Sequence, residues 1–400
     1  MLIKYIFRGQ NNMKVLMMPC GIGMGHTSRS ISLAEKLQER NVEVVFASYG
    51  SGYEMLKAQG KYETAKLPDI KFYGNNGGFD IKYTARKSID VPFIFLKSIY
   101  HESKIIKKFK ADVIVADAHY SVPITAKVLG VPCIMVTNEL TLNFSRLYPD
   151  EKTMEYLENG LKRFINDVLK LCSAILIPDI ENSIEVPPKL KEKTIFTGPF
   201  LKQNPDEMED KKKIRQKLGF KEDEKIVLVT VGGSEFGKKL LSIIYDASEE
   251  IDCDKLIIIT GPQIDSDFIP DSDKIIKKKF LENIMEWMKL SDVIVSLAGH
   301  ATTMEIASLG IPSIIVPVEN HSEQLKNALA MKKYGISYVK NIKELGLEEL
   351  SLDINNILKD EDLIKKIDNI KKEFSKYNGT RNAVEIILKS AELKSNIYNG

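Results

Sequence analysis

The sequence has few cysteines and no long apolar run, and each absence excludes a class of protein. Its four cysteines, Cys20, Cys133, Cys172 and Cys253, form no CxxC pair and lack the spacing of metal ligands, so we expect reduced thiols in a cytoplasmic protein. No stretch approaches the roughly 20 apolar residues of a membrane-spanning helix. The apolar run within residues 1–12 is too short for a signal peptide, so this stretch is either a loose arm or precedes a start at Met13.

An excess of charge of one sign is also missing, because 57 Lys and Arg residues face 55 Asp and Glu residues. This balance gives no indication of a nucleic-acid partner. What the chain does have is length, since 400 residues fit two domains of roughly 180 residues each better than one.

Short runs rich in Ile and Val alternate with amphipathic stretches along the chain. Continuous apolar strands are typical of parallel sheets covered on both faces, so each half is expected to be a doubly wound, Rossmann-like α/β domain. The expected strands are 14–18, 42–47, 112–116, 133–136, 174–177 and 194–197, then 225–231, 255–260, 274–277, 293–296, 313–316 and 337–339.

A charged, proline-containing segment, residues 198–225, separates the two sets of strands. It predicts an N-terminal domain over 1–200 and a second domain over 201–372. The last stretch, 373–400, is expected to be helical and could pack back on the first domain. Two such sheets joined by one linker leave a central cleft, which is the usual place for a ligand.

Two glycine-rich turns imitate phosphate-binding motifs without completing them. In GIGMGHTSRS, residues 21–30, His26 stands where a dinucleotide fingerprint requires its third glycine, after Gly21, Gly23 and Gly25. In VGGSEFGKKLL, residues 231–241, Lys239 stands where a P-loop requires Ser or Thr. Dinucleotide-binding and P-loop sites are therefore disfavoured, although the turn at Gly232, Gly233 and Ser234 could still bind an anion.

A third turn, within SLAGHATTMEIASLGIPSIIVPVENHSEQLKNA (residues 296–328), offers more polar groups. Gly299 ends a strand, and the helix that begins at His300 and Ala301 has Thr302 and Thr303 in its first turn, where free amides attract a diphosphate. Glu305 lies one turn deeper and could accept hydrogen bonds from a ribose. Glu323, Gln324 and Asn327 begin the next helix and suit sugar hydroxyls, although each of these residues alone could be an ordinary helix cap.

With these motifs the chain resembles the GT-B glycosyltransferases, in a family-28-like branch that contains the lipid II-forming N-acetylglucosaminyltransferase (MurG) and the UDP-glycosyltransferases. The likeness covers most of the chain and is most specific over 279–328. It implies a cleft between the two domains, with donor-binding roles for Glu305 (ribose), Gln324 and Asn327 (sugar), and Phe280 and Leu281 (uracil side). The chain departs from the family pattern at Leu297, His300 and Glu323, which leaves the sugar and the acceptor open.

The reaction that the resemblance implies is transfer of a hexose from a UDP-sugar to a hydroxyl or phosphate acceptor, with inversion. His26 is the expected base, because an imidazole is largely neutral at pH 7. Asp117, at the end of a strand in the same sheet, either orients His26 or merely caps that strand; His119 is the alternative base. Helix N-termini and hydroxyls could stabilise the leaving group, so no metal and no cofactor beyond the donor substrate is expected.

The acceptor is expected at the first domain, next to Gly23, Gly25, His119 and Asn138. The segment 82–110 mixes aromatic and basic residues, which suits docking of a lipid-linked acceptor at the inner face of a membrane; a helix with one buried and one basic face is the plainer alternative. Two further functions stay open, a UDP-GlcNAc 2-epimerase of the same fold and a non-catalytic nucleotide-sugar-binding module. The oligomeric state is also open.

Overall fold

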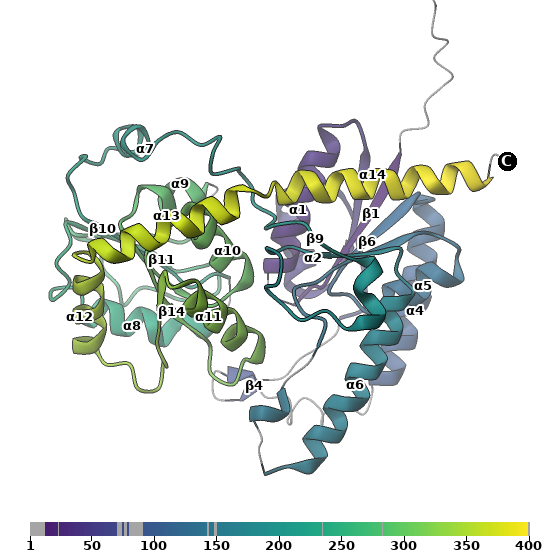
Figure 1. The fold of residues 1–400 in the computed structure, drawn as a ribbon, viewed down its shortest axis with the longest axis horizontal. Coiled ribbons are helices and arrows are strands. Elements are labelled where there is room, and N and C mark those ends of the chain that lie inside the picture. The colour runs from purple at the N-terminus through teal and green to yellow at the C-terminus, as the bar shows by residue number, and fades with distance from the viewer. Residues whose placement is uncertain are drawn as a thin grey trace, which may run out of the picture.

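The computed structural model describes residues 13–398 apart from 23, 70–73, 76–77, 80–90, 142–143, 148–149, 234 and 282. The expected 1–12 arm, Gly23 and Ser234 therefore lie outside the described residues. Two lobes, each built on a sheet flanked by helices, are joined by the chain at two places (Figure 1). Both sheets are entirely parallel, which confirms the doubly wound α/β class.

The first lobe contains a seven-stranded sheet in the order β3-β2-β1-β6-β7-β8-β9. Its strands carry continuous apolar runs and are covered on both faces, by two separate clusters of buried side chains. The strands are β1 (Lys14–Pro19), β2 (Glu43–Ser48), β3 (Glu63–Lys66), β6 (Val113–Asp117), β7 (Cys133–Val136), β8 (Ala174–Ile177) and β9 (Thr194–Phe196), with a separate hairpin of β4 (Gly74–Asn75) and β5 (Gly78–Phe79). The helices are α1 (Gly25–Gln38), α2 (Gly50–Gln59), α4 (Val91–Phe109), α5 (Val122–Val128) and α6 (Lys152–Lys170).

The second lobe contains a six-stranded sheet in the order β12-β11-β10-β13-β14-β15, around its own core. Its strands are β10 (Ile226–Thr230), β11 (Lys255–Ile259), β12 (Ile275–Lys278), β13 (Val293–Leu297), β14 (Ser313–Val316) and β15 (Ser337–Val339). Its helices are α7 (Lys211–Leu218), α8 (Lys238–Asp246), α9 (Ile284–Leu290), α10 (His300–Leu309), α11 (Ser322–Tyr334), α12 (Leu347–Ile357) and α13 (Glu361–Ser375).

The last helix, α14 (Gly379–Tyr398), crosses back to the first lobe and lies along it (Figure 1). Its apolar face, Ala383, Val384, Ile387 and Ala391, is buried in the core beneath β1 and α1. The two crossings of the chain touch each other, because Asn382 Nδ2 donates to the carbonyl of Thr197 at 2.9 Å. The two chain connections between the lobes therefore lie next to each other.

Candidate active site

The strand order reverses at one place in each sheet, between β1 and β6 and between β10 and β13. Loops leave the carboxyl ends of such neighbouring strands in opposite directions and open a crevice there. Residues from both crevices line one cleft of about 320 Å³ between the lobes. Eight of the predicted site residues line this cleft: Gly25, His26, Gly233, Gly299, His300, Ala301, Glu323 and Gln324.

His26 lies in the first turn of α1, and Asp117 is the last residue of β6. The Nδ1 atom of His26 is 2.8 Å from Oδ1 of Asp117. Burial alone would raise the pKa of this fully buried carboxyl, but the Arg29 guanidinium and His26 lower that pKa to about 2. Because an ionised carboxylate only accepts hydrogen bonds, Nδ1 of His26 is the donor.

Arg29 is a part of this cluster that the sequence motifs did not reveal. Its Nε donates to Oδ2 of Asp117 at 2.6 Å, and its Nη2 donates to Oδ1. The Arg29 side chain is only 5% exposed. Three-residue spacing places it on the same side of α1 as His26, and this GHxxR spacing is the signal that could have identified it.

The glycines of the first turn serve two purposes. A side chain at Gly21 would have its Cβ 1.8 Å from the carbonyl oxygen of Tyr49, so only glycine lets this turn pack against the start of α2. A Cβ at Gly25 would meet nothing within 4 Å, and Gly25 instead leaves the cleft open beside His26. Across the cleft, Gly233 approaches Met24 so closely that a Cβ there would lie 2.0 Å from the Met24 methyl carbon.

The N-terminus of α10 points its free amides at the cleft, with His300 and Ala301 lining it. Thr302 is half-buried, whereas Thr303 is fully buried and its hydroxyl donates to the carbonyls of Gly299 and His300. Thr303 thus fixes the first turn of the helix, and the hydroxyl of Thr302 would lie 4.0 Å from a Cβ at Gly299. Nε2 of His300 lies 3.9 Å from Oδ2 of Asp179 in the first lobe.

The start of α11 supplies carboxylate and carboxamide groups. Asn138 Nδ2 donates to Oε1 of Glu323 at 2.9 Å, which joins the two lobes across the cleft. Burial would raise the pKa of Glu323, but His26 and the Asn138 hydrogen bond outweigh it and the pKa is lowered. Gln324 accepts from the Val318 amide at 2.9 Å, and buried Asn327 donates to the Ala298 carbonyl at 3.0 Å. Asn327 therefore holds the loop that ends β13.

Several predicted donor-side residues lie outside the lining of the cleft itself: Gly232, Phe280, Leu281, Thr302, Thr303, Glu305 and Asn327. Glu305 is half-buried on α10, and burial raises its pKa to about 7, partly offset by the charge of Lys202. Phe280 is 56% exposed on the loop after β12, and Leu281 beside it packs partly against the core of the second lobe.

The alternative base, His119, is buried behind the cleft rather than lining it. It is 3% exposed, its ring meets the ring of Tyr49 edge-on at 5.5 Å, and its Nε2 lies 3.4 Å from Oε1 of Glu102 on α4. The preceding residue, Ala118, has a φ of +50°, a left-handed conformation that non-glycine residues rarely adopt. This backbone turn directs Asp117 and His119 to different surroundings.

Sequence motifs did not identify several other residues that line the cleft. Besides Arg29, these are Ile22, Ser51, Phe236, Gln263 and His321. They lie in loops or at the starts of helices after different strands, so only the folded topology brings them together. His321 also caps α11, with its Nδ1 accepting from the amide of Gln324 at 3.4 Å.

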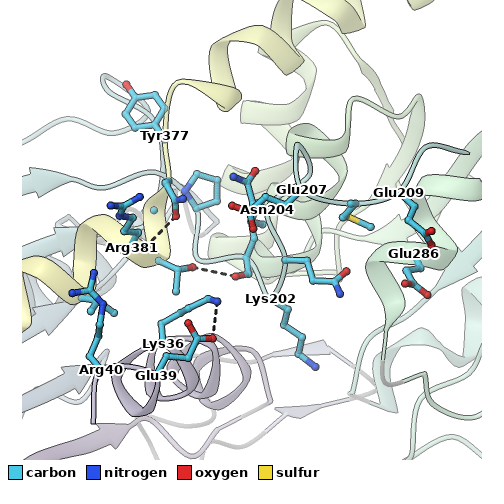
Figure 2. Close-up of a pocket in the computed structure, with 18 residues that line it drawn as sticks. Lys36, Glu39, Arg40, Lys202, Asn204, Glu207, Glu209, Glu286, Tyr377 and Arg381 are labelled. Atoms are coloured by element: carbon cyan, nitrogen blue, oxygen red, sulfur yellow. Dashed lines mark hydrogen bonds and ion pairs between the residues drawn. The ribbon is translucent and has the colours of Figure 1, made fainter. Parts of the chain in front are cut away.

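A second, larger cavity of about 560 Å³ lies where the two chain crossings meet, and it shares no lining residue with the cleft (Figure 2). Lys36, Arg40 and Arg381 line its first-lobe side, and Glu209 and Glu286 its second-lobe side. Several of these charges are paired: Lys36 with Glu39 at 2.7 Å, and Glu286 with Lys217 at 3.0 Å. The cavity thus belongs to the hinge.

Within the described part of the chain, no three His, Cys, Asp or Glu side chains are grouped as metal ligands. The sequence has three DxD triplets, at 252–254, 265–267 and 271–273, and their aspartates lie in loops. Asp252 pairs with Lys225 at 3.0 Å. No helix among the described residues is long and apolar enough to span a bilayer.

Comparison with known proteins places this site in a family. Residues 226–381 match the glycosyltransferase family 28 C-terminal domain. A protein of Methanopyrus kandleri named as an uncharacterized glycosyltransferase is 29% identical over 80% of this chain and 90% of its own length. The Staphylococcus epidermidis UDP-N-acetylglucosamine--N-acetylmuramyl-(pentapeptide) pyrophosphoryl-undecaprenol N-acetylglucosamine transferase is 27% identical over 88% of this chain and 93% of its own.

Among solved structures, Acinetobacter baumannii MurG superposes with a TM-score of 0.64 at 18% identity, covering 94% of this chain and 99% of that one. Agreement over nearly the whole length confirms the GT-B arrangement of two facing doubly wound lobes. This chain is a family-28-like glycosyltransferase of the GT-B fold.

Proposed function

We propose that this glycosyltransferase moves a hexose from a UDP-sugar to a hydroxyl or phosphate group of a lipid-linked acceptor, with inversion and without a metal ion. The observation that carries the proposal is the cleft, where a hydrogen-bonded His26–Asp117 pair on one lobe faces the α10 N-terminus and Glu323 on the other. One lobe thus offers a base, and the other offers sites for a diphosphate and a sugar.

On the donor side, the free amides at the start of α10 suit a diphosphate, because a helix N-terminus carries partial positive charge. These amides would also stabilise the charge that builds on the departing UDP. Glu323 and Gln324, at the start of α11, line the same cleft and suit hydroxyls of the sugar. Glu305 would accept hydrogen bonds from the ribose diol, with Phe280 and Leu281 beside the uracil.

On the acceptor side, Nε2 of His26 would take the proton from the attacking hydroxyl. Gly25 leaves room next to the imidazole for that hydroxyl to approach. The similarity to the transferase of Staphylococcus epidermidis, whose name specifies a UDP-sugar and an undecaprenol-linked acceptor, supports the same classes of substrate here.

A surface on the first lobe suits contact with a membrane. Helices α4 and α6 run side by side, with the rings of Phe95 and Phe164 in edge-to-face contact at 5.7 Å (Figure 1). We call this the α4–α6 surface; its exposed apolar members are Phe93, Leu96, Tyr100, Tyr156, Leu161 and Phe164. Helix α4 also carries four exposed lysines, Lys97, Lys104, Lys107 and Lys108. Exposed apolar and basic side chains together suit binding to an anionic bilayer at the cytoplasmic face. Residues 82–90 of the predicted docking segment lie outside the described residues.

Binding of the nucleotide tests the donor assignment. UDP in excess should raise the melting temperature of the wild-type protein, because a ligand that binds only the folded state stabilises it. The Glu305→Ala variant should lose most of that shift, while a Glu249→Ala control, at an exposed turn after α8 that does not line the cleft, should keep it. If no nucleoside diphosphate raises the melting temperature, the donor site is assigned wrongly.

A further inference from the structure

In the first-lobe part of the site, the side chains of His26 and Arg29 both contact the same oxygen atom of Asp117. Oδ1 of Asp117 receives both Nδ1 of His26, at 2.8 Å, and Nη2 of Arg29. Because the two nitrogens approach the same oxygen, they lie only 3.0 Å from each other. Asp117 is fully buried and Arg29 nearly so, whereas the His26 side chain is 19% exposed. Both His26 and Arg29 line the cleft, but the imidazole is the more exposed of the two.

We infer that Arg29 is a positioning residue that keeps His26 neutral, with the lone pair of Nε2 directed at the acceptor. The inference rests on the proposed transferase function, in which His26 is the base. It goes further by assigning control of the proton on His26 to a neighbouring residue that acts through the imidazole.

Charge balance is the first reason. A buried carboxylate beside an imidazole favours the imidazolium form, and an opposite charge this close typically moves a titration by about one to three pH units. An imidazolium has no lone pair and cannot accept a proton from the acceptor. Arg29 cancels the charge of Asp117, and its guanidinium, 3.0 Å from Nδ1, would also repel a positive charge on the ring.

The choice of tautomer is the second reason. A guanidinium donates hydrogen bonds and cannot accept them, and the ionised Asp117 can only accept them. An unprotonated Nδ1 could accept from Nη2 of Arg29 at 3.0 Å, but its lone pair would then face the anionic Oδ1 at 2.8 Å. The favoured state is therefore the one in which Nδ1 carries the proton and donates it to Oδ1. Nε2 is then left unprotonated on the cleft side. Because Nε of Arg29 holds Oδ2 at 2.6 Å, the carboxylate cannot rotate Oδ1 away from His26.

Another charged group that faces His26 is Glu323 on α11, whose pKa is lowered in part by His26, and the rings of His300 and His321 line the same cleft. Its carboxylate also favours the imidazolium, although the hydrogen bond from Asn138 satisfies one of its oxygens. Without Arg29, His26 would face two carboxylates, Asp117 and Glu323, and would lack the guanidinium that lies 3.0 Å from its Nδ1. Arg29 is thus the group that offsets the carboxylate closest to the ring.

The proton follows a simple path in this arrangement. As the acceptor oxygen forms its bond to the anomeric carbon, its proton passes to Nε2 of His26. The bond between that carbon and the diphosphate oxygen breaks, and its electron pair leaves with UDP. His26 then carries a positive charge until it loses the proton to solvent, and Asp117 stabilises this transient form through the Nδ1 hydrogen bond.

The test uses three variants of the full-length chain. Arg29→Met keeps the length of the apolar stem and removes the charge, whereas Arg29→Lys keeps the charge. The double variant Arg29→Met/Asp117→Asn removes both charges together, and it preserves the fold if the single Met variant does not tolerate an unpaired buried carboxylate. The protonation of His26 is read from ¹⁵N-labelled histidine spectra, with His26→Gln to identify its signals, and the pH profile of kcat/KM is measured with UDP-sugars.

The wild-type spectrum at pH 7.5 should show His26 protonated at Nδ1 only. Arg29→Met should show imidazolium at that pH, with the acidic limb of kcat/KM moved up by at least one pH unit and activity partly recovered at higher pH. Arg29→Lys and the double variant should both stay close to the wild-type midpoint. An unchanged titration in Arg29→Met, or in the double variant a shift as large as in Arg29→Met, would overturn the inference.

Failure of the proposed function and failure of the role of Arg29 would give different results. If no UDP-sugar is turned over or bound, the proposed function fails, while the histidine spectra still report on Arg29. If Arg29→Met turns over UDP-sugars with a kcat/KM that is lower by the same factor at every pH, and the midpoint of the profile does not move, Arg29 is a structural residue only.

Discussion

Among individual residues, Glu305 gives the donor site a dependence on pH. Burial raises its pKa to about 7, and the ionised form accepts hydrogen bonds from a ribose diol better than the protonated form. Affinity for UDP should therefore fall as the pH falls through 7, by up to about tenfold between pH 8 and pH 6. Calorimetric titrations across this range would measure it, with Glu305→Gln as the control, in which only the titration of UDP itself remains.

The buried pair of Arg29 and Asp117 should also matter for stability. Asp117→Leu leaves the guanidinium without its carboxylate, and breaking a buried pair in this way costs about 3–5 kcal/mol. The melting temperature should drop by several degrees, whereas Asp252→Leu at the exposed pair with Lys225 should leave it unchanged within error. Equal effects of the two substitutions would contradict the importance of the buried pair.

Because the pKa of Asp117 is lowered in the folded protein, the stabilisation that this carboxylate gives the fold decreases at low pH. A carboxyl whose pKa falls to about 2 in the folded protein stabilises it fully above its ordinary value near 4. That stabilisation is lost as the pH drops from about 4 towards 2. The stability of the wild-type protein should decline in this window more steeply than that of the double variant Arg29→Met/Asp117→Asn.

Sequence reasoning could place His26 and Asp117 near one another, because both follow parallel strands and such strand ends share one edge of a sheet. It could not identify Arg29, because a residue on the buried side of a helix is expected to be apolar. The carboxylate that Arg29 pairs with, Asp117, lies far away in the sequence, and only the fold brings the two together. The same limit applies to Thr303, whose hydroxyl bonds its own helix rather than facing the cleft. Whether a polar side chain turns inward depends on contacts between distant segments.

At the scale of elements, the twelve strands expected from Ile and Val runs are all present, with ends that differ by about one residue. The strand β3 was not expected, because its sequence ETAK lies at the sheet edge and is half-exposed rather than apolar. The C-terminal stretch forms two helices, α13 and α14, instead of one. Gly379 marks the start of the second, at the crossing between lobes.

The α4–α6 surface yields a prediction of its own. Leu96 is 64% exposed on α4, and Leu352 is 60% exposed on α12 in the other lobe. Leu96→Ser should weaken sedimentation of the protein with anionic phospholipid vesicles several-fold, and Leu352→Ser should have no such effect. If both variants bind vesicles like the wild type, the α4–α6 surface does not dock on membranes.

At the scale of the whole molecule, the two lobes hinge where residues 197–201 cross 377–380. A Cβ at Gly379 would lie 2.2 Å from the carbonyl oxygens of Gly198 and Pro199. Gly379→Ala should therefore force the crossing apart and lower the melting temperature. Gly160→Ala is the matched control, because a Cβ there meets nothing within 4 Å on α6 and the exchange should stabilise that helix slightly, by up to about 1 kcal/mol.

Polar contacts on the other side of the hinge hold the lobes together across the cleft. Asn138 bonds Glu323 at 2.9 Å, and Lys326 lies 3.8 Å from Glu139. An acceptor and a donor bound on opposite lobes would meet only while these contacts bring His26 close to the α10 N-terminus. Asn138→Ala should accordingly lower kcat more than it weakens UDP binding, as comparison of steady-state kinetics with calorimetry would reveal.

The most direct test of the transferase assignment is UDP release from UDP-hexoses, followed by product analysis and compared between the wild type and His26→Gln. We expect the wild type to release UDP and a transferred or hydrolysed sugar, and His26→Gln to bind UDP with similar affinity but release it at least about 100-fold more slowly. A 2-epimerised sugar, UDP binding without turnover, or an unimpaired His26→Gln variant would contradict the assignment of a transferase with His26 as its base.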